Sequence, residues 1–311
     1  MREFYLQSVI FCVVLLVPGC LKKNVVTDTS SSYLGQTPPG RTPAVFGPGI
    51  INTEDKNHSS VTVSPDGMEM FWSLFSSIDN IRQERIWTVK MEQGSWSRPR
   101  VASFSGLYRD GQPAFSPNGK MLYFSSERPV SPDDSSGDAN IWYVERQGFS
   151  WSAPVSLNTV NTSENSEWFP SVTRDGTLYF SMNVPGSGSS WDIYAAEYRS
   201  GMYEKPVKLS GMINGLYADM TPFIAPDERF LLFFSERPDG RFEDGRLFIS
   251  YRLQDGTWGE AHKLGGFFDT AASRFPSLST DGMYLFFTRL QDHKEDVCWV
   301  EADILHKTYK E

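Results

Sequence analysis

Short apolar runs alternate with polar turn residues through most of the chain. In residues 112–129 two such runs, Pro113–Phe115 and Met121–Phe124, flank the tetrapeptide Ser116–Gly119. Proline presets φ for a turn, and the Asn-Gly pair in this tetrapeptide accepts the positive φ that a tight hairpin requires. The pattern therefore predicts a β-hairpin over this stretch.

The hairpin unit occurs five times, and its turns begin 52, 57, 52 and 54 residues apart. Each turn is followed by a strand rich in aromatic residues. The five turns are Ser64–Gly67, Ser116–Gly119, Thr173–Gly176, Ala225–Glu228 and Ser279–Gly282. A repeat of about 50 residues made only of strands is typical of a β-propeller.

Each full repeat carries two more strand signals, for example Asn140–Val144 and Pro154–Leu157, separated by a glycine hairpin and an aromatic residue. The fifth repeat lacks its fourth strand after Val300, but Thr42–Asn52 parallels Lys205–Asn214 in sequence. We therefore predict an all-β fold, a five-bladed β-propeller of four-stranded antiparallel blades. The N-terminal strand is expected to complete the last blade, which removes an exposed sheet edge.

The N-terminus reads as a targeting segment. Arg2 precedes the apolar run Val9–Val17, which is too short to span a bilayer, and residues 16–20 resemble the cleavage box of bacterial lipoproteins. This resemblance implies a signal peptide over residues 1–19 and acylation of Cys20, and Leu21 after it favours the outer membrane. An ordinary secretory signal with an incidental cysteine is the alternative. Residues 20–41 are expected to be a lipidated cysteine with a flexible linker, because they are rich in Ser, Thr, Pro and Gly.

Composition narrows the remaining choices. The repeats fill residues 42–311, so we expect one propeller domain, and the net charge of −9 argues against nucleic acid as a partner. With Cys12 removed and Cys20 acylated, Cys298 has no disulfide partner, and its apolar surroundings predict a buried, inert thiol. We expect no cofactor, and the four histidines lack metal-ligand spacing.

Several short motifs together are similar to the repeats of the TolB-like propeller family. They are Ser116–Gly119, Leu122–Ser126, Arg128-Pro129 and Asp192–Tyr194. The resemblance covers residues 42–300 and implies the propeller fold. It leaves function open, because family members include envelope scaffolds, peptidase propellers and a few carbohydrate-active enzymes. TolB-type proteins with six blades and an added α/β domain differ from this chain, so their partners do not carry over.

Polar residues precede each inner strand, where loops of all blades are expected to converge on the mouth of the central channel. Alignment on Ser60, Pro113, Pro170, Pro222 and Pro276 gives two successive rings of residues. The first ring is Asn57, Asp110, Glu167, Asp219 and Ser273. The second ring is His58, Gly111, Trp168, Met220 and Arg274.

From these rings the candidate ligand site consists of His58, Asp110, Glu167, Trp168, Asp219 and Arg274. Carboxylates around one channel suit glycoside cleavage, and a histidine among carboxylates also suits a metal ion. Alternatively, such residues cap loops through local hydrogen bonds. The repeated pairs Glu127-Arg128 and Glu236-Arg237, with Arg289 in the comparable place, indicate a structural salt bridge, or an arginine that clamps a carboxylate.

Three functions remain compatible with this sequence. The favoured one is a lipid-anchored, monomeric binding or scaffold module of the bacterial cell envelope, held at the membrane and bound to an envelope protein or glycan. A glycosidase or lyase that uses the channel carboxylates is the alternative. A purely structural module is the third, since a fold does not specify a function.

Overall fold

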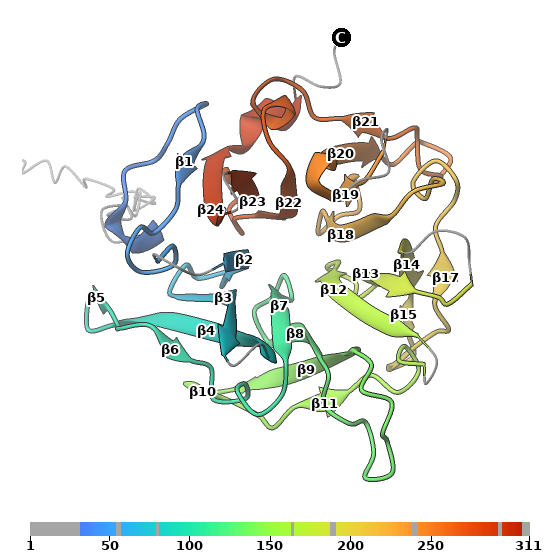
Figure 1. Ribbon diagram of the computed structural model, residues 1–311, viewed down its shortest axis with the longest axis horizontal. Helices are drawn as coiled ribbons and strands as arrows, with labels where there is room; N and C mark the ends of the chain where they lie inside the picture. The colour runs from blue at the N-terminus through green and yellow to red at the C-terminus, as the bar shows by residue number, and fades with distance from the viewer. Residues whose placement is uncertain are drawn as a thin grey trace, which may run out of the picture.

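The computed structural model describes residues 32–53, 57–78, 81–162, 165–186, 191–237, 242–291 and 294–306. Five antiparallel sheets stand around a central axis as the blades of a propeller (Figure 1). The predicted fold class is confirmed. Among the described residues, no helix is long and apolar enough to cross a membrane.

The blades follow one another in sequence order, and the inner strand of each is the first. Blade 1 contains β2 (Asn57–Val63), β3 (Glu69–Ile78), β4 (Ile81–Glu92), β5 (Ser95–Trp96) and β6 (Arg100–Val101). Blade 2 contains β7 (Asp110–Phe115), β8 (Met121–Ser126), β9 (Asn140–Gln147), β10 (Ser150–Trp151) and β11 (Val155–Ser156). Blade 3 contains β12 (Ser166–Val172), β13 (Leu178–Asn183), β14 (Asp192–Ala196) and β17 (Val207–Lys208).

The remaining elements complete the ring. Blade 4 contains β18 (Asp219–Ile224), β19 (Phe230–Ser235), β20 (Arg246–Tyr251) and β21 (His262–Lys263). Blade 5 contains β22 (Ser273–Leu278), β23 (Tyr284–Gln291), β24 (Lys294–Glu301) and β1 (Ala44–Val45). Outside these sheets lie the hairpin β15 (Tyr198–Arg199) with β16 (Met202–Tyr203) and the 3₁₀ turns η1 (Tyr33–Gly35), η2 (Phe242–Asp244), η3 (Gly266–Asp269) and η4 (Ala302–His306).

The repeated turns form for the local reason that the sequence indicates. In the turn of blade 1, Gly67 has a φ of +70° and its N–H donates to the carbonyl of Ser64 at 2.8 Å. The Ser64 hydroxyl donates to Asp66 Oδ1 at 2.5 Å, and the Met68 N–H donates to the same oxygen at 3.0 Å. These hydrogen bonds lower the pKa of Asp66 against the opposing effect of its burial, so the turn favours the ionised carboxylate.

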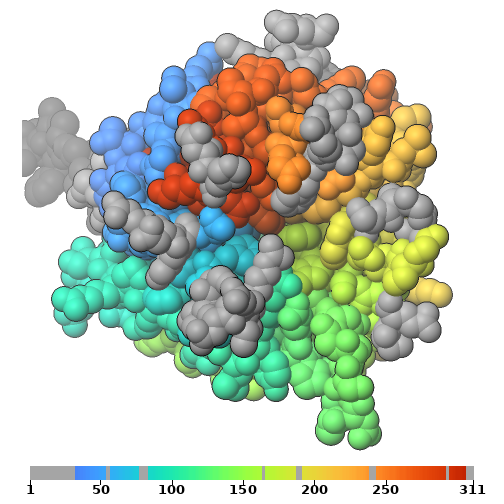
Figure 2. Space-filling model, in the orientation of Figure 1, coloured from blue at the N-terminus to red at the C-terminus, as the bar shows by residue number. Residues whose placement is uncertain are grey.

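The N-terminal strand closes the ring as predicted. In β1, Ala44 pairs with Trp299 and Val45 with Cys298 of β24. Asn52 fixes the end of this segment, since its side chain accepts from Val297 N–H at 2.8 Å and donates to the Val297 carbonyl at 2.8 Å. Figure 2 shows the blue N-terminal segment against the red C-terminal one.

Residues 32–41 pack against blade 5, whereas the sequence placed them in a flexible linker. The Tyr33 ring lies 5.0 Å from Tyr284 and 5.7 Å from Trp299, measured between centroids, and its hydroxyl donates to Asp281 at 2.7 Å. Tyr33 thus anchors the segment on an aromatic surface, and the Gln36 side chain adds a hydrogen bond to the Val45 carbonyl at 2.7 Å. The signal peptide over residues 1–19 and Cys20 lie outside the described residues.

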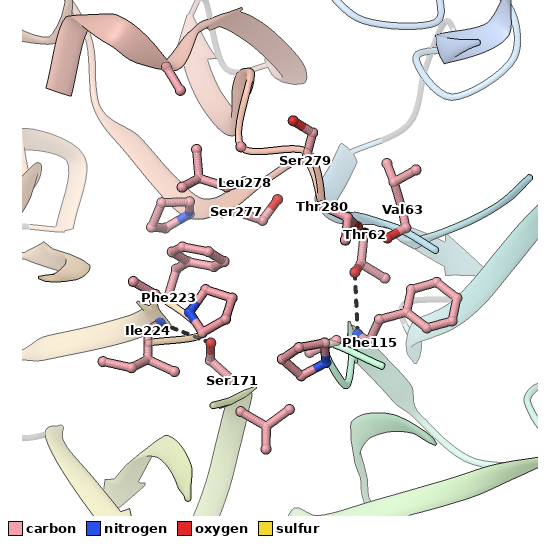
Figure 3. A pocket seen from close by; sticks show the side chains of 18 of the residues that line it. Thr62, Val63, Phe115, Ser171, Phe223, Ile224, Ser277, Leu278, Ser279 and Thr280 are labelled. Carbon is pink, nitrogen blue, oxygen red and sulfur yellow. Dashed lines mark hydrogen bonds between the residues drawn. The ribbon is translucent and has the colours of Figure 1, made fainter. Parts of the chain in front are cut away.

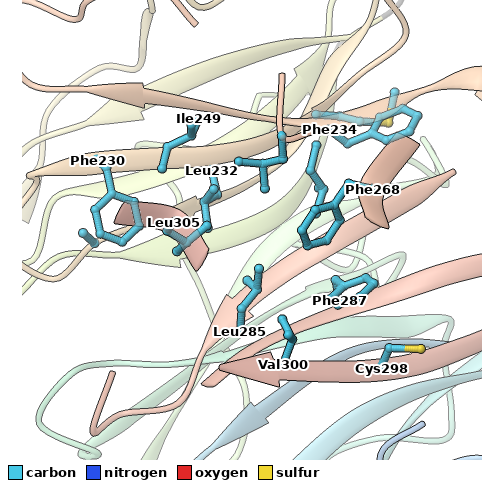
Figure 4. Close-up of a cluster of buried hydrophobic side chains, with 14 of the residues drawn as sticks. Phe230, Leu232, Phe234, Ile249, Phe268, Leu285, Phe287, Cys298, Val300 and Leu305 are labelled. Carbon is cyan, nitrogen blue, oxygen red and sulfur yellow. The ribbon is translucent and has the colours of Figure 1, made fainter. Parts of the chain in front are cut away.

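The hydrophobic core lies between the blades. In Figure 4, Phe230, Leu232 and Ile249 of blade 4 face Leu285, Phe287 and Val300 of blade 5. Cys298 lies at the edge of the same cluster, and burial raises the pKa of its thiol to about 11. The predicted burial of the Cys298 thiol is therefore confirmed.

Serine hydroxyls link neighbouring blades at the start of the inner strands. A β-bulge interrupts every inner strand, and one residue of each bulge has a positive φ. At three of the bulges the N–H of this residue leaves the ladder and donates to a serine of the preceding blade. These bonds are Gln112 to Ser73 at 2.7 Å, Phe169 to Ser125 at 3.1 Å and Thr221 to Ser181 at 3.1 Å.

Candidate functional site

The bulges correct the ring alignment of the sequence. The positive-φ residues Ser60, Gln112, Phe169, Thr221 and Phe275 occupy equivalent places. Val61, not Ser60, is therefore the counterpart of Pro113. Consequently His58, not Asn57, stands in the ring of Asp110, Glu167, Asp219 and Ser273, and Ser59 precedes the bulge.

All five members of the corrected ring are buried, with exposed fractions of 0–1%. Four of them hold the loop that leads into their own strand. His58 Nε2 accepts from Thr53 N–H at 3.1 Å, and Glu167 Oε1 accepts from the Thr162 hydroxyl at 2.9 Å. Asp110 Oδ2 accepts from Gly106 N–H at 3.1 Å, as Asp219 Oδ2 does from Gly215 N–H at 2.6 Å. The loop-capping alternative describes these contacts.

Two arginines neutralise the two aspartates of the ring. Arg128 Nη2 lies 2.7 Å from Asp110 Oδ1, and Arg237 Nη2 lies 2.7 Å from Asp219 Oδ1. Each arginine also donates to a loop carbonyl, that of Phe104 or Ile213. The predicted structural salt bridges thus exist, but their acid is the ring aspartate and not the adjacent Glu127 or Glu236.

The other predicted site residues are likewise enclosed by contacts. The Arg109 guanidinium lies 4.5 Å from the Trp168 ring centroid and so covers the surface on which a sugar would stack. Arg274 is 4% exposed and lies 3.2 Å from Glu295 Oε1, while His58 Nδ1 lies 3.3 Å from the Glu295 carbonyl. Glu295 therefore links His58 to Arg274, and Arg109 links the loop of blade 2 to Trp168.

Two buried carboxyl groups have strongly perturbed acidity. Burial raises the pKa of Glu84 to about 8 against the opposing effect of Arg109, and burial raises the pKa of Glu167 to about 8. Gln112 donates to Glu84 Oε1, and Arg109 Nε lies 3.4 Å from Glu84 Oε2. Sequence reasoning missed Glu84 because it lies on a third strand, outside the repeated motifs. The sequence around it gave no signal, because Glu84 stands among the polar residues Arg82, Gln83 and Arg85.

The central channel holds a pocket of about 650 Å³. All five inner strands line it, and it extends to the turns Ser116-Pro117, Pro226-Asp227 and Ser279–Gly282. Figure 3 shows the labelled side chains of these strands around an open centre. None of the six predicted site residues lines this pocket. The channel-mouth site at the strand starts stays a prediction, and this pocket extends instead toward the strand ends.

Apolar groups dominate the pocket wall. Pro113, Pro170, Pro222 and Pro276 form one layer, and Phe115 and Phe223 lie nearer the turns. At the strand starts Phe169 and Phe275, from blades 3 and 5, lie 5.6 Å apart between ring centroids. Because these blades are not neighbours, the two rings meet across the channel and narrow it there.

The hydroxyl groups of the wall are used between blades. Thr62 Oγ1 accepts from Phe115 N–H at 3.3 Å, and Ser171 Oγ accepts from Ile224 N–H at 3.0 Å, both drawn in Figure 3. Ser277 donates to the Val61 carbonyl at 2.7 Å. At the narrow end, the side-chain oxygens of Ser60, Gln112 and Thr221 that lack a described partner are buried from solvent.

Ion pairs and hydrogen bonds also engage three carboxylates of the pocket rim. Asp227 lies 2.7 Å from Arg229, Asp303 pairs with Arg41, and Asp281 accepts from the Tyr33 hydroxyl. No group of three or more His, Cys, Asp or Glu side chains suited to a metal ion occurs among the described residues.

Neither protein-family models nor curated proteins match the chain. Several solved structures match the chain at low identity. A puromycin-hydrolysing peptidase of Mycobacterium tuberculosis is 17% identical, with a TM-score of 0.44 over 82% of this chain and 38% of that one. An oligogalacturonate lyase in complex with manganese is 13% identical, with a TM-score of 0.44 over 80% and 66%. An α-L-arabinanase of Penicillium chrysogenum complexed with arabinobiose is 13% identical, with a TM-score of 0.46 over 85% and 77%.

The chain thus spans 38% of the peptidase and 66% of the lyase. At these identities the likeness concerns architecture and carries no information on the ligand. The arrangement of the five sheets identifies the chain as a β-propeller, and its function is argued from its own residues.

Proposed function

We propose that the protein is a binding module of the bacterial cell envelope, anchored through acylated Cys20, that takes an apolar segment of an envelope protein into its channel pocket. In this proposal the protein is a monomer and is held at the outer membrane by its lipid anchor.

One observation carries the choice of a protein ligand, namely the chemistry of the pocket wall. Proline and phenylalanine side chains line it, and the hydroxyls of Thr62, Ser171 and Ser277 are engaged between blades. Sugar recognition requires several free polar groups that face the ligand, whereas the unpartnered oxygens of Ser60, Gln112 and Thr221 are buried from solvent. An apolar side chain gains by burial, at about 25 cal/mol per Å². The wall therefore favours a peptide segment over a glycan.

The contacts of the ring residues weigh against the carbohydrate-active alternative. Glycoside cleavage needs two carboxyl groups that face one sugar from suitable separation. Asp110 and Asp219 are each bound to an arginine, and neither lines the pocket. A binding role requires no such pair.

A blocked pocket tests the proposal on soluble residues 32–311. The change Ala114→Trp places an indole in the channel, and Ala153→Trp makes the same change at an exposed position outside it. An array of envelope-protein peptides and a set of peptidoglycan and plant-type oligosaccharides serve as probes. We expect apolar peptides to bind, Ala114→Trp to weaken them about tenfold or more, which corresponds to ~1.4 kcal/mol, and Ala153→Trp to leave them unchanged.

Three outcomes speak against the proposal. Peptide binding that survives Ala114→Trp would place the site elsewhere. Binding or cleavage of an oligosaccharide, with no peptide bound, would favour the enzyme. Binding of neither class would favour the purely structural role.

A further inference from the structure

One of the five turns departs from the repeat at the rim of the channel pocket. The second residue of the turn is proline in blades 1, 2 and 4, whereas blade 3 has Arg174 in this place. Without a proline ring Arg174 keeps its backbone N–H, which donates to the Pro226 carbonyl of the next turn at 2.9 Å. This bond holds Arg174 between the turns of blades 3 and 4, where it lines the pocket.

The positive charge of Arg174 is not neutralised within the part of the chain that the structure describes. Its side chain is exposed, and its guanidinium forms no ion pair or hydrogen bond there. The neighbouring Asp175 accepts from the Thr177 N–H at 3.3 Å inside its own turn and does not line the pocket. In the adjoining turn Asp227 is paired with Arg229 at 2.7 Å. The Arg174 guanidinium is therefore left for a ligand.

The opposite charge gathers on the blade 5 side of the rim, which blade 4 separates from blade 3 (Figure 1). Three acids line the pocket there, namely Asp281, Glu301 and Asp303. Among the described residues only Asp303 has an ion pair, with Arg41, while Asp281 accepts from the neutral Tyr33 hydroxyl at 2.7 Å. A ligand anion is thus attracted on the blade 3 side and repelled on the blade 5 side.

We propose that Arg174 binds a carboxylate of the ligand whose apolar part fills the channel pocket. This inference rests on the proposed function where the ligand is a peptide, and it names the group by which that peptide is recognised. A guanidinium donates two parallel N–H bonds to a carboxylate, and the proline and phenylalanine wall beside it buries the apolar part. The carboxylate comes from a free C-terminus or from an acidic residue next to the apolar ones.

Titration calorimetry on residues 32–311, which contain all five blades, tests this recognition with matched probes. The peptide probes are a hexapeptide that ends in Leu-Phe as the free acid, the same peptide as the amide, and the amide extended by one Asp. Hexanoate and hexanamide form a pair without a peptide. We expect each carboxylate probe to bind about fivefold more tightly than its amide partner, and we expect this preference to shrink as salt rises. An extended peptide that binds like the amide would assign the carboxylate to the C-terminus.

Variants of two rim arginines show which one reads the carboxylate. Arg174→Gln should lower the affinity for carboxylate probes about fivefold and leave the amides unchanged. Arg229→Gln is the matched control, because Arg229 also lines the rim but is paired with Asp227, and it should leave both kinds of probe unchanged. Arg174→Glu should reverse the preference toward an amide extended by one Lys. Ala114→Trp should weaken every probe.

The outcomes separate this inference from the proposed function. Peptides that bind equally as acid and amide, or that weaken equally in Arg174→Gln and Arg229→Gln, would overturn the inference and leave the peptide pocket in place. An Arg174-dependent preference for hexanoate over hexanamide, with no peptide bound, would support the inference and overturn the peptide as ligand. Binding of none of these probes would overturn both.

Discussion

The change Glu167→Gln is expected to stabilise the protein at neutral pH and to have little effect at pH 4. The Glu167 side chain is fully buried, Oε1 accepts from Thr162, and Oε2 has no partner among the described groups. Burial raises the pKa of Glu167 from 4.5 to about 8. At neutral pH the folded protein therefore holds a proton that the unfolded chain has released.

The sign and size of the effect follow from this difference. Because the folded pKa lies above the unfolded one, stability is fully present below pH 4.5 and is lost as pH rises toward about 8. The loss is ~1.4 kcal/mol per pH unit, so it reaches about 3 kcal/mol at pH 7. Glutamine keeps the shape and the bond to Thr162 and needs no proton, so it should recover most of that loss at pH 7.

Urea unfolding of residues 32–311 at pH 4 and pH 7, followed by tryptophan fluorescence, measures the effect. The exposed Glu145 supplies the matched control Glu145→Gln, which should change stability by less than about 0.5 kcal/mol at both pH values. If Glu167→Gln destabilises the protein at pH 7, or shifts both midpoints equally, the reasoning from burial is refuted. Loss of peptide binding in the same variant without loss of stability would instead return Glu167 to the list of site residues.

Three further predictions concern the fold and the anchor. Deletion of Thr42–Asn52 removes the fully buried side chains of Phe46 and Ile51, whose burial contributes about 1.5–3 kcal/mol each, and exposes the edge of blade 5. This deletion should therefore cause unfolding or aggregation, whereas deletion of residues 22–31 should leave the melting temperature unchanged. Equal effects of the two deletions would contradict ring closure by β1. Gly111→Ala should cost about 1–3 kcal/mol in chemical unfolding, because the new Cβ would collide with the Glu84 carboxylate, and an unchanged midpoint would disprove that close approach. Cys20→Ser should yield an unacylated, unprocessed protein by mass spectrometry, and an identical mature N-terminus in both proteins would refute the lipid anchor.

The sequence by itself determined the number of blades, the order of their strands and the way in which the ring closes. These features depend on local chemistry, because a Ser-x-Asp-Gly turn specifies its own φ and hydrogen bonds wherever it occurs. The equivalence of Asn52 and Asn214 could be predicted for the same reason. Each asparagine side chain forms hydrogen bonds with the backbone of a strand in its own blade, at Ile193 for Asn214 and at Val297 for Asn52.

Only the tertiary structure decided which side chains meet. The bulges shift the register of each inner strand, and an alignment on Ser60 instead of Val61 moved His58 out of its ring, because side chains alternate with a period of two. The partner of Arg128 lies 18 residues away at Asp110, and the cover of Trp168 is Arg109 from the preceding blade. Such contacts arise from the packing of one blade against the next, which no single repeat encodes.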